Sequence, residues 1–223
     1  MLRLSLTARC NLACPYCLPD GREPADLLNL SQRLQVVAAA VALGATSLRL
    51  TGGEPLLHPG LEALLEALQP LRQQGLREIA LTSNGTLLTA ARAQALREAG
   101  LDRITLSLDG ADGPSVARMA GLPDGAAGER ALGAVLAAIE HARAAGFEPT
   151  SGGLKLNAVI QRGINDDQLR PLAALARGRG LELRLIEYMD VGNRNGWSPE
   201  AVVPAAEMLE LIGRHWPLEP LGR

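Results

Sequence analysis

The chain has 223 residues, of which 47% are hydrophobic and 21% are charged, a composition that supports a buried core in one soluble domain. Its formal net charge of −2 gives no electrostatic reason to expect nucleic acid or a membrane surface as a partner. No apolar run approaches the roughly 20 residues that span a bilayer, and Arg3 and Arg9 interrupt the apolar stretch that a signal peptide would need. We therefore expect a cytoplasmic protein.

Short β-like runs alternate with longer stretches of helical spacing. The expected strands are 2–7, 47–51, 78–82, 103–108, 154–160 and 181–187, and the expected helices are 31–43, 60–73, 88–98, 131–145, 166–178 and 205–214. Six βα units predict an α/β fold with a parallel sheet and helices outside it. Because six is too few for a closed eight-stranded barrel, we expect an open (β/α)6 three-quarter barrel, formed by one domain over residues 1–223. The segment 110–130, rich in Gly, Ala and Asp, is expected to be a long mobile connection.

All three cysteines follow the first expected strand, in the pattern Cys10-x3-Cys14-x2-Cys17. Three thiolates this close together can hold three corners of a [4Fe–4S] cluster, which ordinarily has four cysteine ligands. A zinc site needs four ligands, commonly in paired spacings, and the first histidine, His58, lies far along the chain. An odd number of cysteines disfavours a disulfide framework. The pattern therefore predicts a cluster with one open iron site.

Further candidate residues follow the later strands, where an open parallel sheet places its chemistry. Tyr16 lies between two of the cysteines, so its ring is expected close to the cluster, either against a bound cofactor or against the barrel wall. Gly53 and Glu54, in the run Gly-Gly-Glu-Pro, can present backbone groups and a carboxylate to a ligand ammonium. Ser107 is expected to point into the barrel, because its two leucine neighbours point to the opposite side.

Lys155 is the one lysine among 22 basic residues. A compact ammonium suits a phosphate or sugar oxygen, although chance survival in an arginine-biased composition is an alternative. Together with Arg3, Arg49 and Arg184 on other strands, Lys155 would form a ring of cations if all four face inward. Such a ring favours a substrate of several negative charges, for example a triphosphate, but some of the arginines could instead form structural ion pairs.

These segments together resemble the radical S-adenosylmethionine (SAM) enzymes, and within them the GTP 3′,8-cyclase family of molybdenum cofactor biosynthesis. The cysteine loop and Gly-Gly-Glu-Pro are typical of radical SAM enzymes in general. The segments that single out the cyclase family are KLNAVIQRGINDDQ at 155–168 and RLIEYMDVGNRNGW at 184–197, and LTSNG at 81–85 and TLSLD at 105–109 also match. The resemblance covers nearly all of the chain.

The resemblance implies a lyase that cleaves SAM reductively to a 5′-deoxyadenosyl radical. This radical removes the 3′ hydrogen of GTP, and the product is 3′,8-cyclo-7,8-dihydro-GTP. An electron donor is a further implied partner. By the same resemblance, Cys10, Cys14 and Cys17 hold the cluster and are catalytic, Tyr16, Gly53, Ser107 and Met189 contact SAM, and Arg3, Arg49, Thr82 and Lys155 contact GTP.

The chain also departs from the family pattern. Members of the family continue with a C-x2-C and a later cysteine that hold a second cluster, whereas this sequence ends at Arg223 without them. We therefore expect a truncated form that binds one cluster and SAM but does not complete the cyclisation alone, and whose open barrel face favours self-association. Two other interpretations stay open: another small radical SAM enzyme, of the activase or peptide-modifying type, and a non-catalytic remnant.

Overall fold

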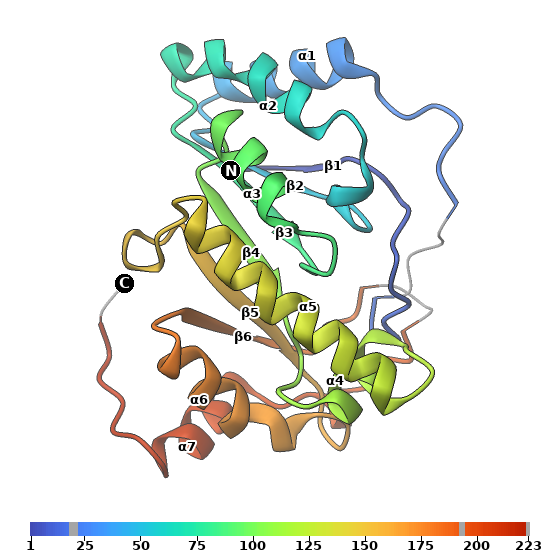
Figure 1. Cartoon of the computed structure of the whole chain (residues 1–223), viewed down its shortest axis with the longest axis vertical. Helices are drawn as coiled ribbons and strands as arrows, with labels where there is room; N and C mark the ends of the chain where they lie inside the picture. The colour runs from blue at the N-terminus through green and yellow to red at the C-terminus, as the bar shows by residue number, and fades with distance from the viewer. Residues whose placement is uncertain (18–21, 192–194, 222–223) are drawn as a thin grey trace. The chain divides into compact units, whose positions relative to one another are not determined.

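A computed structural model describes residues 1–17, 22–191 and 195–221 (Figure 1). The resemblance also covers residues 2–19, around the cysteine loop. This segment and 184–197 run partly outside the described residues, at 18–19 and at 192–194. The chain forms two compact units. The first unit contains Met1–Leu12, Pro19–Ser107 and Gly133–Lys155, and the second contains Ala13–Leu18, Leu108–Leu132 and Leu156–Arg223. The two units are described separately below.

Six strands form one sheet in the order β1-β2-β3-β4-β5-β6, with β1 and β6 at its edges. Their bounds are β1 Leu2–Ser5, β2 Ser47–Thr51, β3 Glu78–Ser83, β4 Arg103–Ser107, β5 Leu154–Ile160 and β6 Glu182–Glu187. The pairs β1–β2, β2–β3 and β3–β4 are all parallel. Strands that neighbour each other in sequence and run parallel need a crossover between them, and the helical segments supply it.

The first unit places its helices against the apolar face of β1–β4. α1 (Leu30–Ala42), α2 (Leu61–Leu68) and α3 (Ala90–Glu98) contact one another in chain order. All the buried residues of α2 are leucines, which match the leucines and isoleucines on alternate positions of the strands. A short 3-10 helix, η1 (Pro55–Leu57), follows β2, and a second, η2 (Gln69–Gln74), continues α2 because Pro70 cannot donate to the α-helical ladder.

The opposite face of the same four strands is polar. The register aligns Arg3 with Arg49, Arg49 with Ala80, and Thr82 with Thr105. The intervening leucines and isoleucines of these strands are nearly all fully buried, while Arg49 and Thr82 keep partial exposure. Since side chains alternate between the two faces of a strand, the sheet of this unit has one apolar face for the core and one face of arginines and hydroxyls.

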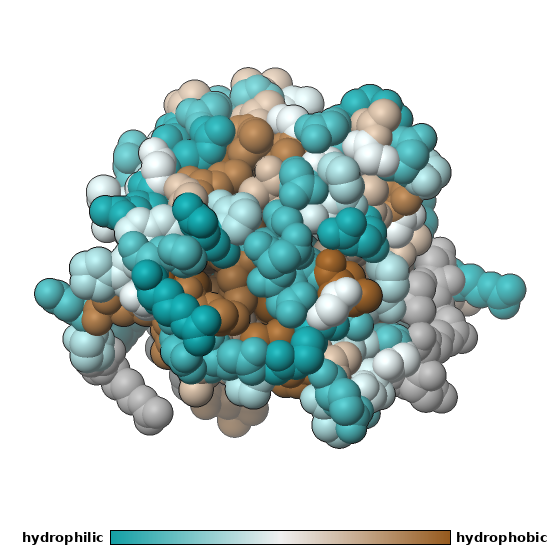
Figure 2. Space-filling model, turned by 90° about the horizontal axis from the view of Figure 1, so that it is seen from below, coloured by the Kyte–Doolittle hydropathy of each residue, from teal (hydrophilic) through white to brown (hydrophobic). Residues whose placement is uncertain are grey.

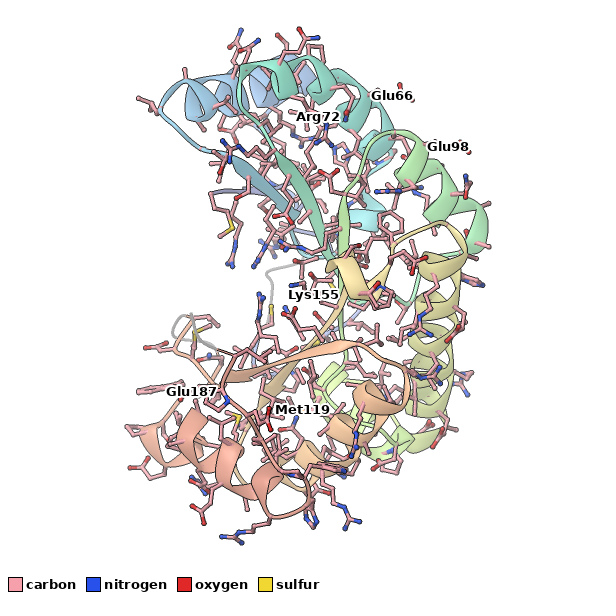
Figure 3. The ribbon with its side chains drawn as sticks, turned by 90° about the vertical axis from the view of Figure 1, so that its left-hand side faces the viewer. Glu66, Arg72, Glu98, Met119, Lys155 and Glu187 are labelled. Atoms are coloured by element: carbon pink, nitrogen blue, oxygen red, sulfur yellow. The ribbon has the colours of Figure 1, made fainter. Side chains whose placement is uncertain are left out.

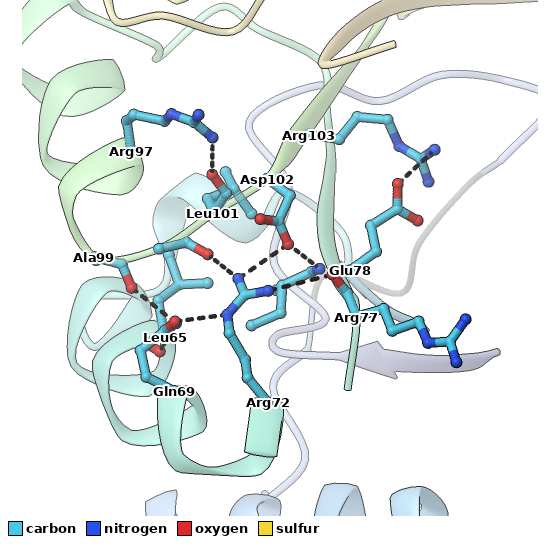
Figure 4. A network of polar contacts seen from close by, with 12 residues as sticks. Leu65, Gln69, Arg72, Arg77, Glu78, Arg97, Ala99, Leu101, Asp102 and Arg103 are labelled. Carbon is cyan, nitrogen blue, oxygen red and sulfur yellow. Dashed lines mark hydrogen bonds and ion pairs between the residues drawn. The ribbon is translucent and has the colours of Figure 1, made fainter. Parts of the chain in front are cut away.

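A network of polar contacts fixes the amino ends of β3 and β4 (Figure 4). The Arg72 guanidinium donates to the Gln69 Oε1 at 2.7 Å, to the Gly100 carbonyl at 2.7 Å and to the Asp102 Oδ2 at 3.0 Å. Asp102 also accepts from the Ile79 N–H at 2.7 Å. These contacts join η2, β3 and the turn before β4 at the amino ends of the strands. The cysteine loop begins at the opposite, carboxyl ends. The polar contacts stabilise the fold and leave the carboxyl ends free for chemistry.

The second unit contains β6 and the helices α6 (Leu169–Gly178) and α7 (Ala205–Gly213), which pack against each other and against β6. It also contains α4 (Gly113–Ala120), the start of the long α5 (Gly125–Ala144), and the short helices η4 (Asp166–Gln168) and η5 (Pro199–Ala201); η3 (Pro149–Ser151) belongs to the first unit. On the face in Figure 2, apolar surface (brown) lies among hydrophilic surface (teal). Leu209 of α7 is 58% exposed, but self-association stays a prediction.

One expectation about the fold is wrong. The segment 110–130 is not a long mobile connection, because it forms α4 and the first turns of α5. Asp112 caps α4 by accepting from the Ser115 N–H at 2.8 Å, Pro114 lies in the first turn, and Gly121 ends the helix with a positive φ of 65°. Asn29 caps α1, because its side chain accepts from the Gln32 N–H at 3.0 Å. None of the described helices is long and apolar enough to cross a membrane.

Candidate functional site

The first part of the cysteine loop lies directly on the glycine pair that follows β2. The Gly53 N–H donates to the Thr7 carbonyl at 2.7 Å, and the Glu54 N–H donates to the Arg9 carbonyl at 2.8 Å. A Cβ on Gly53 would lie 2.2 Å from the Arg9 carbonyl oxygen, a distance that real side chains do not reach. Gly53 is therefore needed for the close approach of two backbone segments. Its expected contact with SAM stays a prediction.

The Cys10 sulfur accepts hydrogen bonds from its own loop and from the turn after β3. The Leu12 N–H lies 3.5 Å from the Cys10 Sγ, and the Asn84 Nδ2 lies 3.9 Å from it. The Asn84 amide also donates to the Asn11 Oδ1 at 2.9 Å. Burial raises the pKa of the Cys10 thiol, against the lowering effect of these donors. Hydrogen bonds to cluster sulfurs are one means by which a protein tunes a cluster. Asn84 was not among the predicted site residues.

The Glu54 carboxylate is buried, with 1% of the residue exposed. It accepts from the Ser83 hydroxyl at 2.8 Å, from the Asn84 N–H at 2.7 Å and from the Leu56 N–H at 3.0 Å. Burial raises its pKa, and the three donors oppose that shift. A carboxylate has about four lone-pair sites, so one site is left for a further donor. The main visible role of Glu54 is to hold the turn that presents Asn84 to Cys10, and the expected contact with a ligand ammonium stays a prediction.

The polar face of the sheet contains three of the four expected GTP contacts. Arg3 and Arg49 are register neighbours on β1 and β2, and Thr82 is on β3. Arg3 is exposed, while Arg49 and Thr82 are half-buried. Among the described residues, the Thr82 hydroxyl oxygen is buried without a hydrogen-bond partner. A buried hydroxyl without a partner is costly, and this cost would be removed by a ligand oxygen or nitrogen.

Ser107 and Lys155 also lie on strands of the first unit. Ser107 is half-buried at the end of β4, whereas Leu106 is fully buried, which fits the expected alternation. Lys155 is half-buried on β5 (labelled in Figure 3). Its ammonium lies 3.7 Å from the position that a Cβ on Gly152 would take, beside the turn before β5. The expected contacts of both residues with ligands stay predictions.

The second part of the cysteine loop is held by the second unit. The Ala13 N–H donates to the Ala120 carbonyl at the end of α4 at 3.1 Å, and the Asn195 amide donates to the Tyr16 carbonyl at 3.4 Å. Gly121 comes so close that a Cβ on it would lie 2.2 Å from the Ala13 carbonyl oxygen. The Cys17 N–H donates to the Cys14 carbonyl at 3.0 Å. This hydrogen bond closes a tight turn that holds the two cysteines close together in space.

A cavity of about 240 Å³ in the second unit brings three predicted site residues together. Tyr16 and Cys17 line it from the loop, and Met189 and Val191 line it from the segment after β6, together with Val159 and residues 186–188. Glu187, labelled in Figure 3, marks the end of β6 beside the cavity. Most of these side chains are apolar, which is typical of a pocket for a small molecule with a few fixed polar contacts.

Asp109 is a residue of this unit that sequence reasoning left without a role. Its Oδ2 accepts from the Tyr16 hydroxyl at 2.7 Å, and its Oδ1 accepts from the Val159 N–H at 2.7 Å. Burial raises the pKa of Asp109 to about 6. Burial also raises the pKa of Tyr16 well above its usual value, with a smaller contribution from the Asp109 charge. The signal in the sequence that could have indicated a role for Asp109 is its position as an acidic residue soon after an apolar strand.

The cysteines fit a cluster in their chemistry. None of the three forms a disulfide, and Cys17 is exposed, so no disulfide competes for the thiolates. Cys10 belongs to the first unit, and Cys14 and Cys17 belong to the second. The described residues contain no group of three His, Cys, Asp or Glu side chains already gathered for a metal ion. The donor set is nevertheless that of three cluster corners, with N–H donors on the Cys10 sulfur.

Comparison with known proteins identifies the family. The model of the Radical SAM superfamily matches residues 4–176. A GTP 3′,8-cyclase of Synechococcus sp. (strain CC9902) is 62% identical over 100% of this chain and 65% of its own length. A GTP 3′,8-cyclase of Xanthomonas campestris pv. campestris (strain B100) is 46% identical over 99% of this chain and 63% of its own length. The chain thus spans about two thirds of the curated relatives that it matches.

Solved structures support the fold. Streptococcus suis SuiB bound to the precursor peptide SuiA has a TM-score of 0.68 and 18% identity, and it covers 85% of this chain and 39% of its own. The structure of anSMEcpe with bound AdoMet and the Cp18Cys peptide has a TM-score of 0.67 and 21% identity, covering 97% and 59%. Together with the six-stranded sheet, these likenesses confirm the predicted α/β fold with an open (β/α)6 arrangement.

Proposed function

Because this chain belongs to the Radical SAM superfamily, we propose that it is the radical SAM part of a GTP 3′,8-cyclase of molybdenum cofactor biosynthesis. The observation that carries the proposal is the identity of 62% to a GTP 3′,8-cyclase over the full length of this chain. The matched length includes all twelve residues predicted for the site. The cofactors of the superfamily are a [4Fe–4S] cluster and SAM, which supply one-electron radical chemistry when bound.

Cys10, Cys14 and Cys17 are the proposed ligands of the cluster. The backbone contacts of Gly53 hold the Cys10 end of the loop, and those of Ala13 and Tyr16 hold the other end. Such contacts order the Cys10 end on the first unit and the Cys14–Cys17 turn on the second unit before a cluster binds, which reduces the ordering cost of binding. Tyr16 and Met189 are proposed for SAM on the cavity that they share, and Gly53, Glu54 and Ser107 are proposed for SAM on the first unit.

Arg3, Arg49, Thr82 and Lys155 are the proposed contacts of GTP. The register of β1 and β2 places Arg3 and Arg49 side by side on the polar face of the sheet, and neighbouring cations favour an anionic ligand there. A triphosphate supplies several negative charges and suits the bidentate geometry of guanidinium groups. The unpartnered hydroxyl of Thr82 on the same face would complete the contact by a hydrogen bond to the ligand.

The remaining proposals concern setting. We propose one radical SAM core domain over residues 1–223 and a cytoplasmic location. A reduced partner must supply the electron for SAM cleavage.

The test is anaerobic reconstitution with iron and sulfide, followed by an iron count and by measurement of 5′-deoxyadenosine formed from SAM with and without GTP. We expect about four irons per chain, as for a [4Fe–4S] cluster, and SAM cleavage that GTP stimulates. A matched variant, Thr82→Val, should keep the iron and weaken the response to GTP. Cleavage that ignores GTP and responds to a peptide would favour another radical SAM enzyme. Failure to bind iron would favour a non-catalytic remnant.

A further inference from the structure

Asp109 has a position that the proposed roles do not explain. Its carboxylate joins the cysteine loop to β5, with both oxygens at 2.7 Å from their donors, the Tyr16 hydroxyl and the Val159 N–H. Its backbone carbonyl accepts from the Asn165 amide at 2.8 Å, and the same amide donates to the Val159 carbonyl at 2.8 Å. Asn165 is completely buried. Every group in this arrangement belongs to the second unit.

The hydrogen bond from the Tyr16 hydroxyl to Asp109 belongs to the stronger class of protein hydrogen bonds. A hydroxyl that donates to an ionised carboxylate makes a short bond of roughly twice the strength of a neutral one. The Oδ1 bond to Val159 and the carbonyl bond to Asn165 hold Asp109 from the other side. The hydroxyl of Tyr16 is thus attached to a rigid point at the ends of β4 and β5. Since Tyr16 has few rotatable bonds, fixing its far end also fixes the tilt of its ring.

The tilt of this ring matters because Tyr16 lines two cavities of the second unit. One is the cavity of about 240 Å³ shared with Cys17 and Met189. The other, of about 290 Å³, is lined by Tyr16 with Pro15, Arg118, Met119, Gln161 and Ile164, and Met119 is labelled in Figure 3. A turn of the ring would change the shape of both cavities. The backbone of Tyr16 lies between Cys14 and Cys17, so the contact of its hydroxyl with Asp109 also restrains that segment.

We propose that Asp109 is a positioning residue that, through the Tyr16 hydroxyl, sets the ring of Tyr16 and the Cys14–Cys17 segment for SAM. This inference rests on the cofactors of the proposed function but not on GTP as the substrate. By this proposal Asp109 acts through Tyr16 and does not itself contact the cofactor. A purely structural role would instead hold β4 and β5 together and leave the affinity for SAM unchanged.

The test uses the full chain after anaerobic reconstitution, with SAM alone as the ligand. Tyr16→Phe removes one oxygen atom, and Asp109→Ala removes the carboxylate. In each variant we expect about four irons per chain. The affinity for SAM is measured from the change that SAM makes in the electron paramagnetic resonance spectrum of the reduced cluster. We expect this affinity to be weaker by about tenfold, as for loss of a charge-assisted hydrogen bond. The double variant should be no weaker than either single one, because both changes remove the same contact.

Asp109→Asn is the rescue variant. Its Oδ1 can still accept from Val159, and its amide can donate to the Tyr16 oxygen, so we expect most of the affinity for SAM to return. Asp102→Asn, in the network at the amino ends of the strands, is the matched control and should lower stability without changing the affinity. As a readout on the cluster-free chain, Tyr16→Phe should increase the rate at which an alkylating reagent modifies Cys14 and Cys17.

Unchanged affinity for SAM in Tyr16→Phe, together with unchanged alkylation rates, would overturn the proposal. If Asp109→Ala fails to fold, Tyr16→Phe and Asp109→Asn still decide the question. Because GTP is absent from every arm, a failure of the cyclase assignment would show itself separately, as SAM cleavage that does not respond to GTP. Loss of iron in Tyr16→Phe would also count against the proposal, because it would show that the contact builds the cluster site itself.

Discussion

Replacing Gly53 by alanine should damage the start of the cysteine loop in a measurable way. The new Cβ would lie 2.2 Å from the Arg9 oxygen, 2.6 Å from the Arg9 carbonyl carbon and 2.7 Å from the Ala8 oxygen. All three atoms are backbone, so the strain cannot be relieved by rotating a side chain. An ordinary carbon–oxygen contact is about 3.4 Å, so the loop must move by about 1 Å.

That movement would weaken the two backbone hydrogen bonds from Gly53 and Glu54 to the loop. Overpacking typically costs about 1–3 kcal/mol, and each weakened hydrogen bond adds up to about 1 kcal/mol. We expect Gly53→Ala to lower the free energy of unfolding of the cluster-free chain by about 2–4 kcal/mol and to lower the iron bound after reconstitution. Denaturant titration and an iron count are the assays.

Gly133→Ala is the matched control. Gly133 is exposed in α5, and a Cβ there would meet no atom within 4 Å. Alanine in a helix is more favourable than glycine by about 1 kcal/mol, so this variant should be neutral or slightly more stable, with full iron content. If Gly53→Ala matched Gly133→Ala in both stability and iron, the tight backbone contact would not exist and the reasoning would be refuted.

Three further changes test other parts of the structure. Thr82→Val should leave the free energy of unfolding unchanged or raise it by about 1 kcal/mol, because it removes a buried hydroxyl without a partner. Calorimetry should show weaker binding of GTP to this variant. A clear loss of stability would mean that the hydroxyl has a partner. Arg72→Ala should lower the free energy of unfolding by about 2 kcal/mol, because it removes half-buried contacts to Gly100 and Asp102. Arg214→Ala is the control, since it removes an exposed ion pair with Glu210. It should change the free energy of unfolding, measured by denaturant titration, by less than about 0.5 kcal/mol. Since burial raises the pKa of Asp109 from 3.8 to about 6, the folded chain holds a proton that the unfolded chain releases in this window, so stability falls as pH rises through it. Asp109→Asn should remove up to about 3 kcal/mol of this pH dependence, and equal slopes of unfolding free energy against pH in the two proteins would contradict it.

The strands were predictable because leucines and isoleucines recur at alternate positions in most of them. The bounds of β2 and β5 agree with the expected ones, and those of the other strands differ by at most two residues at one end. The run Ser47–Thr51 shows why: its leucines are buried and the residues between them are partly exposed, a pattern that only a strand produces. The cysteine loop follows β1 as expected.

The helix α4 was missed because composition was weighted above local signals. The segment is rich in Gly and Ala, which is typical of a mobile connection, yet it begins with an Asp cap and a proline and ends at a glycine. These are the start and stop signals of a helix. The end of α2 at Leu68 likewise follows from Pro70, where apolar spacing alone had extended the helix.

The roles of Glu54 and Asp109 could not be read from the sequence. Whether a carboxylate faces a ligand or is buried among backbone donors depends on which segments fold around it, and those segments come from distant parts of the chain. Glu54 accepts from residues 56, 83 and 84, and Asp109 accepts from residues 16 and 159. A single sequence does not show such long-range partners, so it predicts that these residues matter but not what they touch.

The solitary lysine of β5 has a practical consequence. Because Lys155 is the one lysine in the chain, amine-directed isotopic methylation would label a single side chain, apart from the chain's own amino terminus. The label would sit half-buried on a strand of the first unit, at a residue proposed to meet GTP. Its resonance, followed as GTP and SAM are added in turn, would report on that one position without any mutation.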